Sequence, residues 1–209
     1  MTLGVLGGTF DPIHLGHVAA ADAAQQALSL DSIALVPSRI PPHRADPVSA
    51  SADDRLAMAQ LAASDRPSWS ASRIELDREG PSYTYDTRVE LGQPGTQIFF
   101  ITGADAFAEI ASWSRYPVIL DLANFVVVSR PGITLDSLRE RVPSAFPSSA
   151  LRASSLPSAR TRVILVEAQT PDISSTDIRR RVRAGQHLSG YVPDRVADYI
   201  AAHHLYSGK

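Results

Sequence analysis

Short apolar runs recur along the chain with the composition of buried strands. Each run is rich in β-branched or aromatic residues, is too short for a buried helix, and is followed by turn residues. The runs cover residues 2–6 (TLGVL), 32–36 (SIALV), 97–101 (QIFFI), 124–128 (NFVVV) and 162–166 (RVILV). Such near-continuous runs are typical of parallel strands covered on both faces, so we predict a strand at each of them.

Stretches with helical patterns lie between and after these runs. The candidates are residues 18–28, which are rich in alanine; 51–63, which begin with the capping pattern of Ser51 and Asp54; 85–91; 117–122; and two helices within 177–204, separated by a loop at 185–193. Strands that alternate with helices imply right-handed crossovers and an open sheet. The predicted fold class is therefore α/β: a Rossmann-like, doubly wound parallel sheet with a small C-terminal helical segment at about 177–206.

Two stretches are predicted to be irregular. Residues 37–47 contain four prolines, which favours a loop over the edge of the sheet. Residues 143–161 contain six serines beside Pro and Ala, which is typical of a solvated connection or a flap. No internal repeat and no clear domain boundary is evident, so we expect one domain over residues 1–209.

Composition narrows the class of protein. Apolar residues make up 44% of the chain and charged residues 20%, as in ordinary globular proteins. The first residues lack the basic start of a secretory signal, and their short apolar run ends at Gly7 and Gly8. No stretch approaches the roughly 20 apolar residues that a membrane span requires. We therefore expect a cytoplasmic protein with no membrane partner.

The charged residues are unusual in kind. The chain has 20 Lys and Arg against 22 Asp and Glu, a formal net charge of −2; its one lysine is Lys209, so 19 cations are arginine, and it has no cysteine. The lack of cysteine excludes disulfides, a zinc ribbon, an iron–sulfur site and a cysteine nucleophile. The position of Lys209 disfavours a P-loop lysine or a Schiff base. The near-neutral charge argues against a nucleic-acid binder, which needs excess positive charge to displace counterions.

Candidate chemistry follows the predicted strands. In doubly wound folds, ligands bind at the carboxyl ends of the strands. The segments at these ends are GGTFDPIHLGH (7–17), PSRIPPHR (37–44), TGAD (102–105), SRPG (129–132) and TPDISSTDIRRR (170–181). Glycine, hydroxyl, imidazole and guanidinium groups recur in them, which indicates a ligand rich in phosphate.

The first of these segments is the most informative. Gly7 and Gly8 allow the backbone to turn sharply and to approach a ligand closely. Thr9 and Phe10 then offer backbone N–H groups near a helix start, where anions are favoured. A plain glycine turn is the structural alternative.

Two histidines follow in the same segment. His14 and His17 lie three residues apart, so that on a first helical turn both rings share one face, which Gly16 is expected to keep open. Imidazoles in this place can donate hydrogen bonds to phosphoryl oxygens and stabilise developing charge. The alternatives are two solvated histidines that cap a helix, or a metal site completed by Asp11 or His43.

The last segment allows two interpretations. Ser174 and Asp177 form a capping-box pattern, which starts helices in many proteins. The same helix start presents the Ser175 and Thr176 hydroxyls followed by Arg179, which suits a triphosphate and a departing pyrophosphate. Its pairing with the first segment favours the phosphate interpretation.

Together, these motifs resemble those of a known family. GGTFDPIHLGH is similar to the signature of the HxGH nucleotidyltransferases, and ISSTDIR is similar to their C-terminal phosphate-binding motif. More specifically, the chain resembles the bacterial nicotinate mononucleotide adenylyltransferases from end to end. The further matches are PPHR (41–44), GPSYTYDT (80–87), GAD (103–105), Trp113, SRPG (129–132) and the tail from Tyr191 to Tyr206, whereas residues 143–161 match least.

The resemblance implies a sheet of the nucleotidyltransferase type and a reaction in NAD biosynthesis. The adenylyl group of ATP would pass to nicotinate mononucleotide, giving nicotinate adenine dinucleotide and pyrophosphate. The attacking 5′-phosphate, with a second pKa of about 6, is mostly a dianion at neutral pH and needs no general base. Mg²⁺ would be held mainly by the ATP phosphates and water, with no metal ligand from the protein. The expected partners are these two substrates and no nucleic acid, while homo-oligomerisation stays open.

The resemblance also implies roles for individual residues. The catalytic residues would be His14, His17 and Arg179. ATP would be bound by these three and by Gly7, Gly8, Thr9, Phe10, Gly103, Asp105, Ser175 and Thr176. Nicotinate mononucleotide would be bound by Arg44, Tyr83, Thr84, Trp113 and Arg130. Many relatives carry Lys at the position of Arg44, and we expect function to persist because arginine binds phosphate through two parallel hydrogen bonds.

Some of these residues have structural alternatives. Trp113 is expected to stack on the pyridine ring, but a single Trp is more often a core or interface aromatic. Asp105, expected at the ATP ribose with Gly103, could cap a helix instead. Thr84 would bind the nicotinate carboxylate through its backbone N–H. Arg130 could be a turn residue without a role in binding.

Other functions stay open at this point. The motifs at the two ends of the chain also suit a nicotinamide mononucleotide or phosphopantetheine adenylyltransferase, although YTYDT and Trp113 favour the nicotinate substrate. The chain could also be a non-catalytic nucleotide-binding module, or an RNA-binding module that uses residues 179–183. Nucleotide binding without pyrophosphate release would indicate the first module, and a steep loss of binding with salt would indicate the second.

Overall fold

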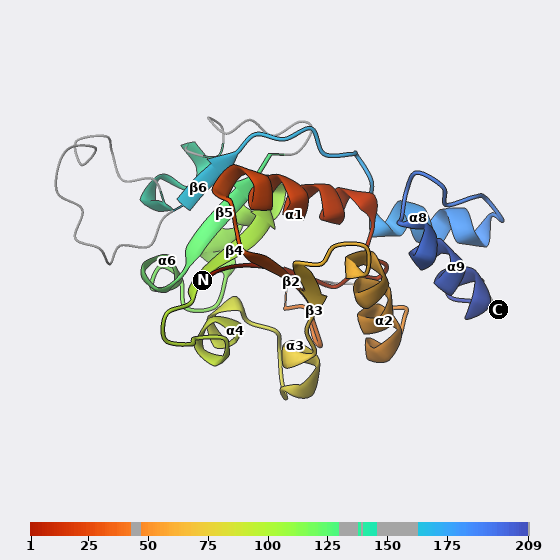
Figure 1. Ribbon diagram of the computed structural model, residues 1–209, viewed down its shortest axis with the longest axis horizontal. Coiled ribbons are helices and arrows are strands. Elements are labelled where there is room, and N and C mark those ends of the chain that lie inside the picture. The colour runs from red at the N-terminus through yellow and green to blue at the C-terminus, as the bar shows by residue number, and fades with distance from the viewer. Residues whose placement is uncertain (43–46, 130–137, 139, 146–162, 209) are drawn as a thin grey trace.

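A six-stranded parallel sheet forms the centre of the molecule (Figure 1). The computed structural model describes residues 1–42, 47–129, 138, 140–145 and 163–208. The strands are β1 (Thr2–Gly8), β2 (Ser32–Pro37), β3 (Trp69–Ala71), β4 (Gln97–Gly103), β5 (Asn124–Val128) and β6 (Val163–Val166). Every neighbouring pair is parallel, and the order across the sheet is β3-β2-β1-β4-β5-β6. This arrangement confirms the predicted doubly wound fold.

The direction of strand addition reverses between β1 and β4. From β1 the chain builds outward through β2 to β3, and it then returns to the other side of β1 and continues through β5 to β6. Leu6, near the end of β1, pairs with Leu35 of β2 and with Ile101 of β4, so the ends of the three strands lie together. In such sheets, the place where the order reverses, called the switch point here, is where ligands bind.

Helices cover both faces of the sheet (Figure 1). One face packs against α1 (Leu15–Leu28) and α2 (Ala52–Ala63), and the core on this side continues to α8 (Ser175–Arg183) and α9 (Asp194–Ala202). The other face packs against α3 (Ile74–Asp77), α4 (Thr84–Glu90), α5 (Ala104–Phe107), the 3₁₀ turn η1 (Ile110–Ser112), α6 (Ile119–Leu122) and the 3₁₀ turn η2 (Pro143–Ala145). Alternate residues of β1, β2, β4, β5 and β6 supply the two cores, which explains why the sequences of these strands are almost continuously apolar.

The strand β3 and the helix α3 are two elements that the sequence patterns did not predict. β3 has only three residues, and it exists because it pairs with β2, with Trp69 opposite Ile33. The Trp69 indole N–H donates to Gln25 Oε1 over 2.7 Å, which fixes this strand against α1. α3 is a single turn. Both are too short to leave a periodic pattern in the sequence.

Three helix starts matter for the site. α2 begins as predicted, with the Ser51 hydroxyl accepting the Asp54 N–H over 3.1 Å. α1 begins at Leu15, three residues before the predicted start, because His14 is its N-cap residue. α8 begins at Ser175, two residues before the predicted start, and the Ser174 hydroxyl accepts the Asp177 N–H over 3.1 Å.

Parts of the two predicted irregular stretches lie outside the described residues. Residues 38–42 and 47 do form loop structure, while 43–46 are not described. Of residues 143–161, the described part is η2, at 143–145. Among the helices of the described part of the chain, none is long and apolar enough to cross a membrane.

Candidate active site

A cavity of about 400 Å³ opens at the switch point, beside the ends of β1 and β4. From β1, β4 and the loop after β1 it is lined by Val5, Gly7, Gly8, Thr9, Phe100, Ile101 and Thr102. The remaining lining residues are Ser38, Pro41, Pro42, Glu75, Ser82, Tyr83, Thr84, Ala106, Trp113 and Ser114. The lining thus combines backbone and hydroxyl groups with aromatic side chains.

The glycine at the end of β1 makes room for a buried ring. Phe10 is 1% exposed, and its backbone has a positive φ of 51°. A Cβ placed on Gly8 would lie 2.7 Å from a carbon of the Phe10 ring, whereas a Cβ on Gly7 would meet no atom within 4 Å. Gly8 is therefore required by packing, and Gly7 leaves the wall of the cavity open.

The two histidines form a stacked pair at the start of α1. Their ring centroids lie 3.6 Å apart, with 29° between the ring planes. The His14 backbone N–H donates to His17 Nδ1 over 3.2 Å. Because Nδ1 accepts this bond, the proton of the neutral His17 ring belongs on Nε2. His17 is thereby oriented as a hydrogen-bond donor through Nε2.

Gly16 does not keep the histidine face open, so that expectation is wrong. It is buried, and a Cβ at this position would lie 3.0 Å from His14 Nδ1 and 3.3 Å from the carbonyl oxygen of Pro171. The absence of a side chain lets the His14 ring and the segment before α8 pack closely against α1. Gly16 therefore helps to bring the first and last motifs together.

Those two motifs are in direct contact. The Ser175 hydroxyl donates to the carbonyl oxygen of Pro12 over 2.9 Å. Arg179 Nη1 donates to the carbonyl oxygen of Asp11 over 2.7 Å, and Nη2 donates to Thr176 Oγ1 over 3.1 Å. Arg179 is only 8% exposed. The late motif is thus both a helix cap and a contact with the loop after β1, while Thr176 stays exposed.

Asp11 organises the buried side of this contact. Its two carboxylate oxygens accept the backbone N–H groups of Ser49 and Ala50, each over 2.9 Å, and Oδ2 lies 3.7 Å from Arg179 Nη1. Burial, and then the negative charge of Asp11, raise the pKa of the Tyr206 hydroxyl. This carboxylate belongs to a protein network, which disfavours the alternative in which it holds a metal.

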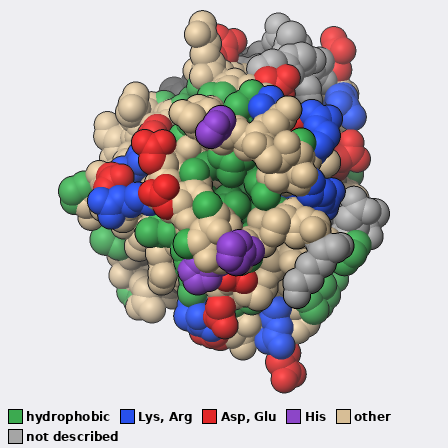
Figure 2. All heavy atoms as spheres, turned by 90° about the vertical axis from the view of Figure 1, so that its right-hand side faces the viewer, with side chains coloured by type: hydrophobic (Ala, Val, Ile, Leu, Met, Phe, Trp, Pro, Cys, Tyr) green, Lys and Arg blue, Asp and Glu red, His purple; other side chains and the backbone are tan. Residues whose placement is uncertain are grey.

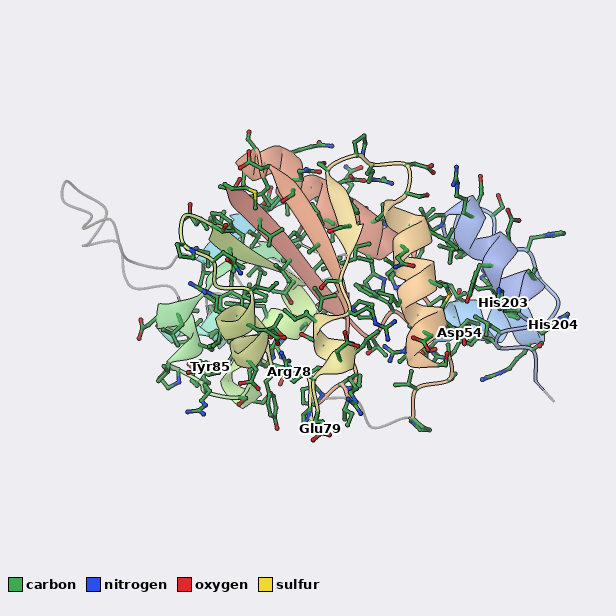
Figure 3. The ribbon with its side chains drawn as sticks, turned by 60° about the horizontal axis from the view of Figure 1, so that its bottom comes forward. Asp54, Arg78, Glu79, Tyr85, His203 and His204 are labelled. Carbon is green, nitrogen blue, oxygen red and sulfur yellow. The ribbon has the colours of Figure 1, made fainter. Side chains whose placement is uncertain are left out.

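The opposite wall carries the residues expected at the mononucleotide. Tyr83, Thr84 and Trp113 all line the cavity. Trp113 is half-buried, and its ring lies edge-on to Phe125, with 6.1 Å between the ring centroids. Arg78 and Glu79 lie between α3 and α4, and Tyr85 lies in the first turn of α4 (Figure 3). This wall is braced by buried Glu75, which accepts the Thr87 hydroxyl over 2.6 Å.

Some expected site residues do not line the cavity. Gly103 and Asp105 flank the start of α5, and Asp105 is exposed, although their neighbours Thr102 and Ala106 are lining residues. His14, His17 and residues 175–179 lie beyond the loop after β1 rather than in the wall. Arg44 and Arg130 fall outside the described residues. The roles of all these residues stay predictions.

Arg55 is a residue that the sequence interpretation missed. It lies in α2, is 2% exposed, and donates through Nη1 to the carbonyl oxygens of Thr9 and Ser38 over 2.7 and 2.6 Å. Both of these acceptors belong to residues that line the cavity. The sequence offers one weak signal, an arginine on the face of a helix whose other buried members are apolar.

A second cavity, also about 400 Å³, lies between α8 and α9. Its lining includes Leu188, Ile200, His187 and His204. Figure 2 shows the face that carries these helices, where histidine side chains lie on either side of an apolar hollow. On the same side of the molecule, Asp54 of α2 accepts the Tyr199 hydroxyl over 3.0 Å, and His203 and His204 follow the end of α9 (Figure 3). This surface is separate from the strand ends.

The strand order and the loop at the switch point define an α/β nucleotidyltransferase fold. Residues 5–181 match the family model described as cytidylyltransferase-like. A protein of Roseiflexus sp. (strain RS-1) named "Probable nicotinate-nucleotide adenylyltransferase" is 44% identical over 205 residues, which are 98% of this chain and 97% of that protein. A protein of Mycobacterium bovis (strain BCG / Pasteur 1173P2) with the same name is 40% identical over 208 residues, 99% and 92% of the two chains.

A solved structure agrees in fold. Plasmodium falciparum nicotinic acid mononucleotide adenylyltransferase complexed with NaAD matches with a TM-score of 0.75 and 20% identity, covering 100% of this chain and 98% of that one. The chain belongs to the cytidylyltransferase-like family and, within it, to the nicotinate-nucleotide adenylyltransferases. The resemblance inferred from the motifs is thereby confirmed.

Proposed function

We propose that this chain transfers the adenylyl group of ATP to nicotinate mononucleotide, forming nicotinate adenine dinucleotide and pyrophosphate. The observation that carries the proposal is the cavity at the switch point, which lies between the glycine loop after β1 and the wall of Tyr83, Thr84 and Trp113. The names of the full-length relatives support it. So do the complexes of the Plasmodium falciparum enzyme, one with NaAD and another with APC.

The reaction needs no proton transfer in its central step. An oxygen of the mononucleotide 5′-phosphate attacks the α-phosphorus of ATP, and the bond from that phosphorus to the bridging oxygen of the β-phosphate breaks. The electron pair of that bond leaves with pyrophosphate. The attacking group is already mostly a dianion at neutral pH. Catalysis therefore consists of aligning two anions that repel each other and of neutralising their charge.

The residues after β1 and at the start of α8 would act on the triphosphate. His17 Nε2 is set to donate because His17 Nδ1 accepts the His14 N–H. With His14 stacked beside it, this donor would stabilise negative charge on the phosphoryl oxygens. Ser175 and Thr176 stand at the start of α8, where anions are favoured, and would face the departing pyrophosphate.

Arg179 would also serve this site by holding two of its segments together. Its guanidinium is bonded to the Asp11 carbonyl and to the Thr176 hydroxyl. It would therefore hold the loop after β1 and the start of α8 together, and its positive charge would favour the nearby phosphates. A direct bond from Arg179 to the β- or γ-phosphate stays a prediction.

The aromatic wall would select the mononucleotide. Trp113 would stack on the pyridine ring, and the Thr84 N–H would donate to the nicotinate carboxylate, with Tyr83 beside it. Asp105 and Gly103 would hold the ATP ribose. Arg44 and Arg130 are proposed for the mononucleotide phosphate on the sequence resemblance alone.

Magnesium would enter with ATP. The described residues contain no group of three or more His, Asp or Glu side chains that could hold a metal ion. We propose that the ion is carried by the phosphate oxygens of ATP and by water. When bound, the ion would neutralise triphosphate charge, and we assign it no ligand from the chain.

The proposal is tested by pyrophosphate release. Purified protein is supplied with ATP, magnesium and either nicotinate or nicotinamide mononucleotide, beside a His17→Ala variant whose fold is checked by circular dichroism. We expect release with the nicotinate substrate, faster than with the amide, and a strong loss in the variant. Absence of release from the wild type with any mononucleotide would exclude the function, and equal activity in His17→Ala would exclude the mechanism.

A further inference from the structure

We propose that Arg55 is a positioning residue for adenylyl transfer, which fixes the backbone that meets the nucleotide; this inference rests on the proposed function. Arg55 lies in α2 and does not line the cavity. Its Nη1 reaches the carbonyl oxygens of Thr9 and Ser38, which belong to two loops at the ends of β1 and β2. It acts from behind the cavity wall.

The two loops form one unit through this contact. The Ser38 N–H donates to the carbonyl oxygen of Gly8 over 2.9 Å, as a continuation of the sheet. Beyond that bond the ladder ends, and Arg55 joins the next two carbonyls with bonds of 2.7 and 2.6 Å. Hydrogen bonds from a charged donor are stronger than those between neutral groups. Because Arg55 is 2% exposed, water does not weaken them.

A hydrogen bond that holds a carbonyl group also fixes the direction of the N–H group in the same peptide. In a trans peptide the C=O and N–H groups point in opposite directions. The Ser38–Arg39 peptide follows this rule: its carbonyl points to Arg55, and the Arg39 N–H donates to the Ser82 hydroxyl over 2.9 Å. Ser82 lines the cavity.

The Thr9–Phe10 peptide is held in the same way. Its carbonyl bonds to Arg55, so its N–H, that of Phe10, is directed away from α2. Phe10 has φ of 51°, a conformation that a non-glycine residue keeps only when its surroundings enforce it. Arg55 supplies part of that enforcement. The Phe10 amide is thereby fixed as a donor for a phosphate before the nucleotide arrives, which is how preorganised donors lower a barrier.

The test compares two variants of Arg55 with a matched control. Arg55→Met keeps the length of the side chain and removes its donors, while Arg55→Lys keeps the charge. The control is Arg66→Met. Arg66 does not line the cavity; it forms an ion pair with Asp22 and lies over the ring of Trp69. Each protein is measured for its melting temperature and for kcat and KM with both substrates.

We expect kcat of Arg55→Met to fall by about 100-fold at temperatures where it is folded, because small displacements of reacting groups have effects of this size. The kcat of Arg55→Lys should be about tenfold higher than that of Arg55→Met, since one cationic donor can still reach a carbonyl. Arg66→Met should lose thermal stability and keep kcat within about twofold of wild type. A merely structural role would lower the melting temperature and leave kcat of the folded protein unchanged.

A spectroscopic readout separates this inference from the function. The ¹⁵N–¹H resonance of the Phe10 amide is followed while ATP alone is added. It should shift in the wild type and shift much less in Arg55→Lys, and this result would support the positioning role even if no pyrophosphate were released. Wild-type kcat together with a wild-type Phe10 shift in folded Arg55→Lys would overturn the proposal, whether or not Arg55→Met folds.

Discussion

Replacing Gly8 with alanine should destabilise the protein, whereas the same change at Gly7 should not. A Cβ at Gly8 would lie 2.7, 3.1 and 3.3 Å from three carbons of the Phe10 ring. That ring is 1% exposed and lies edge-on to His17 at 5.2 Å, so it has no free space to enter. Overpacking of this kind costs about 1–3 kcal/mol. At Gly7 no atom lies within 4 Å of the new methyl group.

Thermal unfolding measures the difference directly. For a chain of this size, about 1–3 kcal/mol lowers the melting temperature by about 2–12 °C. Alanine also restricts the unfolded chain, but it does so at both positions, so the comparison between the two variants isolates the clash. Equal melting temperatures for Gly7→Ala and Gly8→Ala, or a lower one for Gly7→Ala, would refute this account of the loop.

Three further substitutions test other parts of the site and the fold. His17→Ala should lower kcat by about 100- to 1000-fold in a steady-state assay with a folded variant, the range for losing one preorganised donor, and unchanged kcat would contradict its role. Trp113→Ala should raise KM for the mononucleotide by about tenfold and leave KM for ATP unchanged, with Trp113→Phe as the control; an equal rise in both would contradict stacking on the pyridine. The Arg181 hydrogen bond lowers the pKa of Asp177, so its stabilising effect is present above the ordinary Asp pKa of about 3.9 and is lost as the pH falls below it. The difference in melting temperature between wild type and Asp177→Asn should therefore be constant above about pH 5 and shrink as the pH falls below about 3.9, and a difference that stays unchanged at low pH would contradict this linkage.

Local sequence patterns were sufficient to predict most strands of the sheet. Runs such as NFVVV and QIFFI became β5 and β4 because a strand buried on both faces must be apolar along its whole length. β3 could not be predicted in this way, since three residues carry no period and Trp69 becomes a strand residue only by pairing with β2. The start of α1 was displaced because His14, an uncommon N-cap residue, gave no standard capping signal.

In the candidate site, too, features that depend on local spacing could be predicted, whereas contacts between distant residues could not. The stacking of His14 on His17 follows from their spacing, which the sequence displays. The contact of Arg179 with Asp11 joins residues 168 positions apart, and the contact of Arg55 with Thr9 joins residues 46 positions apart. Neither partner can be identified from spacing, because the folded sheet alone brings them together. The same is true of Gly16, whose neighbour is the carbonyl of Pro171.

The central claim is adenylyl transfer to nicotinate mononucleotide, and isotope labelling tests it most directly. The protein is incubated with magnesium, nicotinate mononucleotide and ATP labelled with ³²P at either the α- or the γ-phosphate, and the products are separated. The account predicts that the α-label appears in nicotinate adenine dinucleotide and the γ-label in pyrophosphate. An α-label that never leaves ATP, or that appears only in AMP, would contradict it.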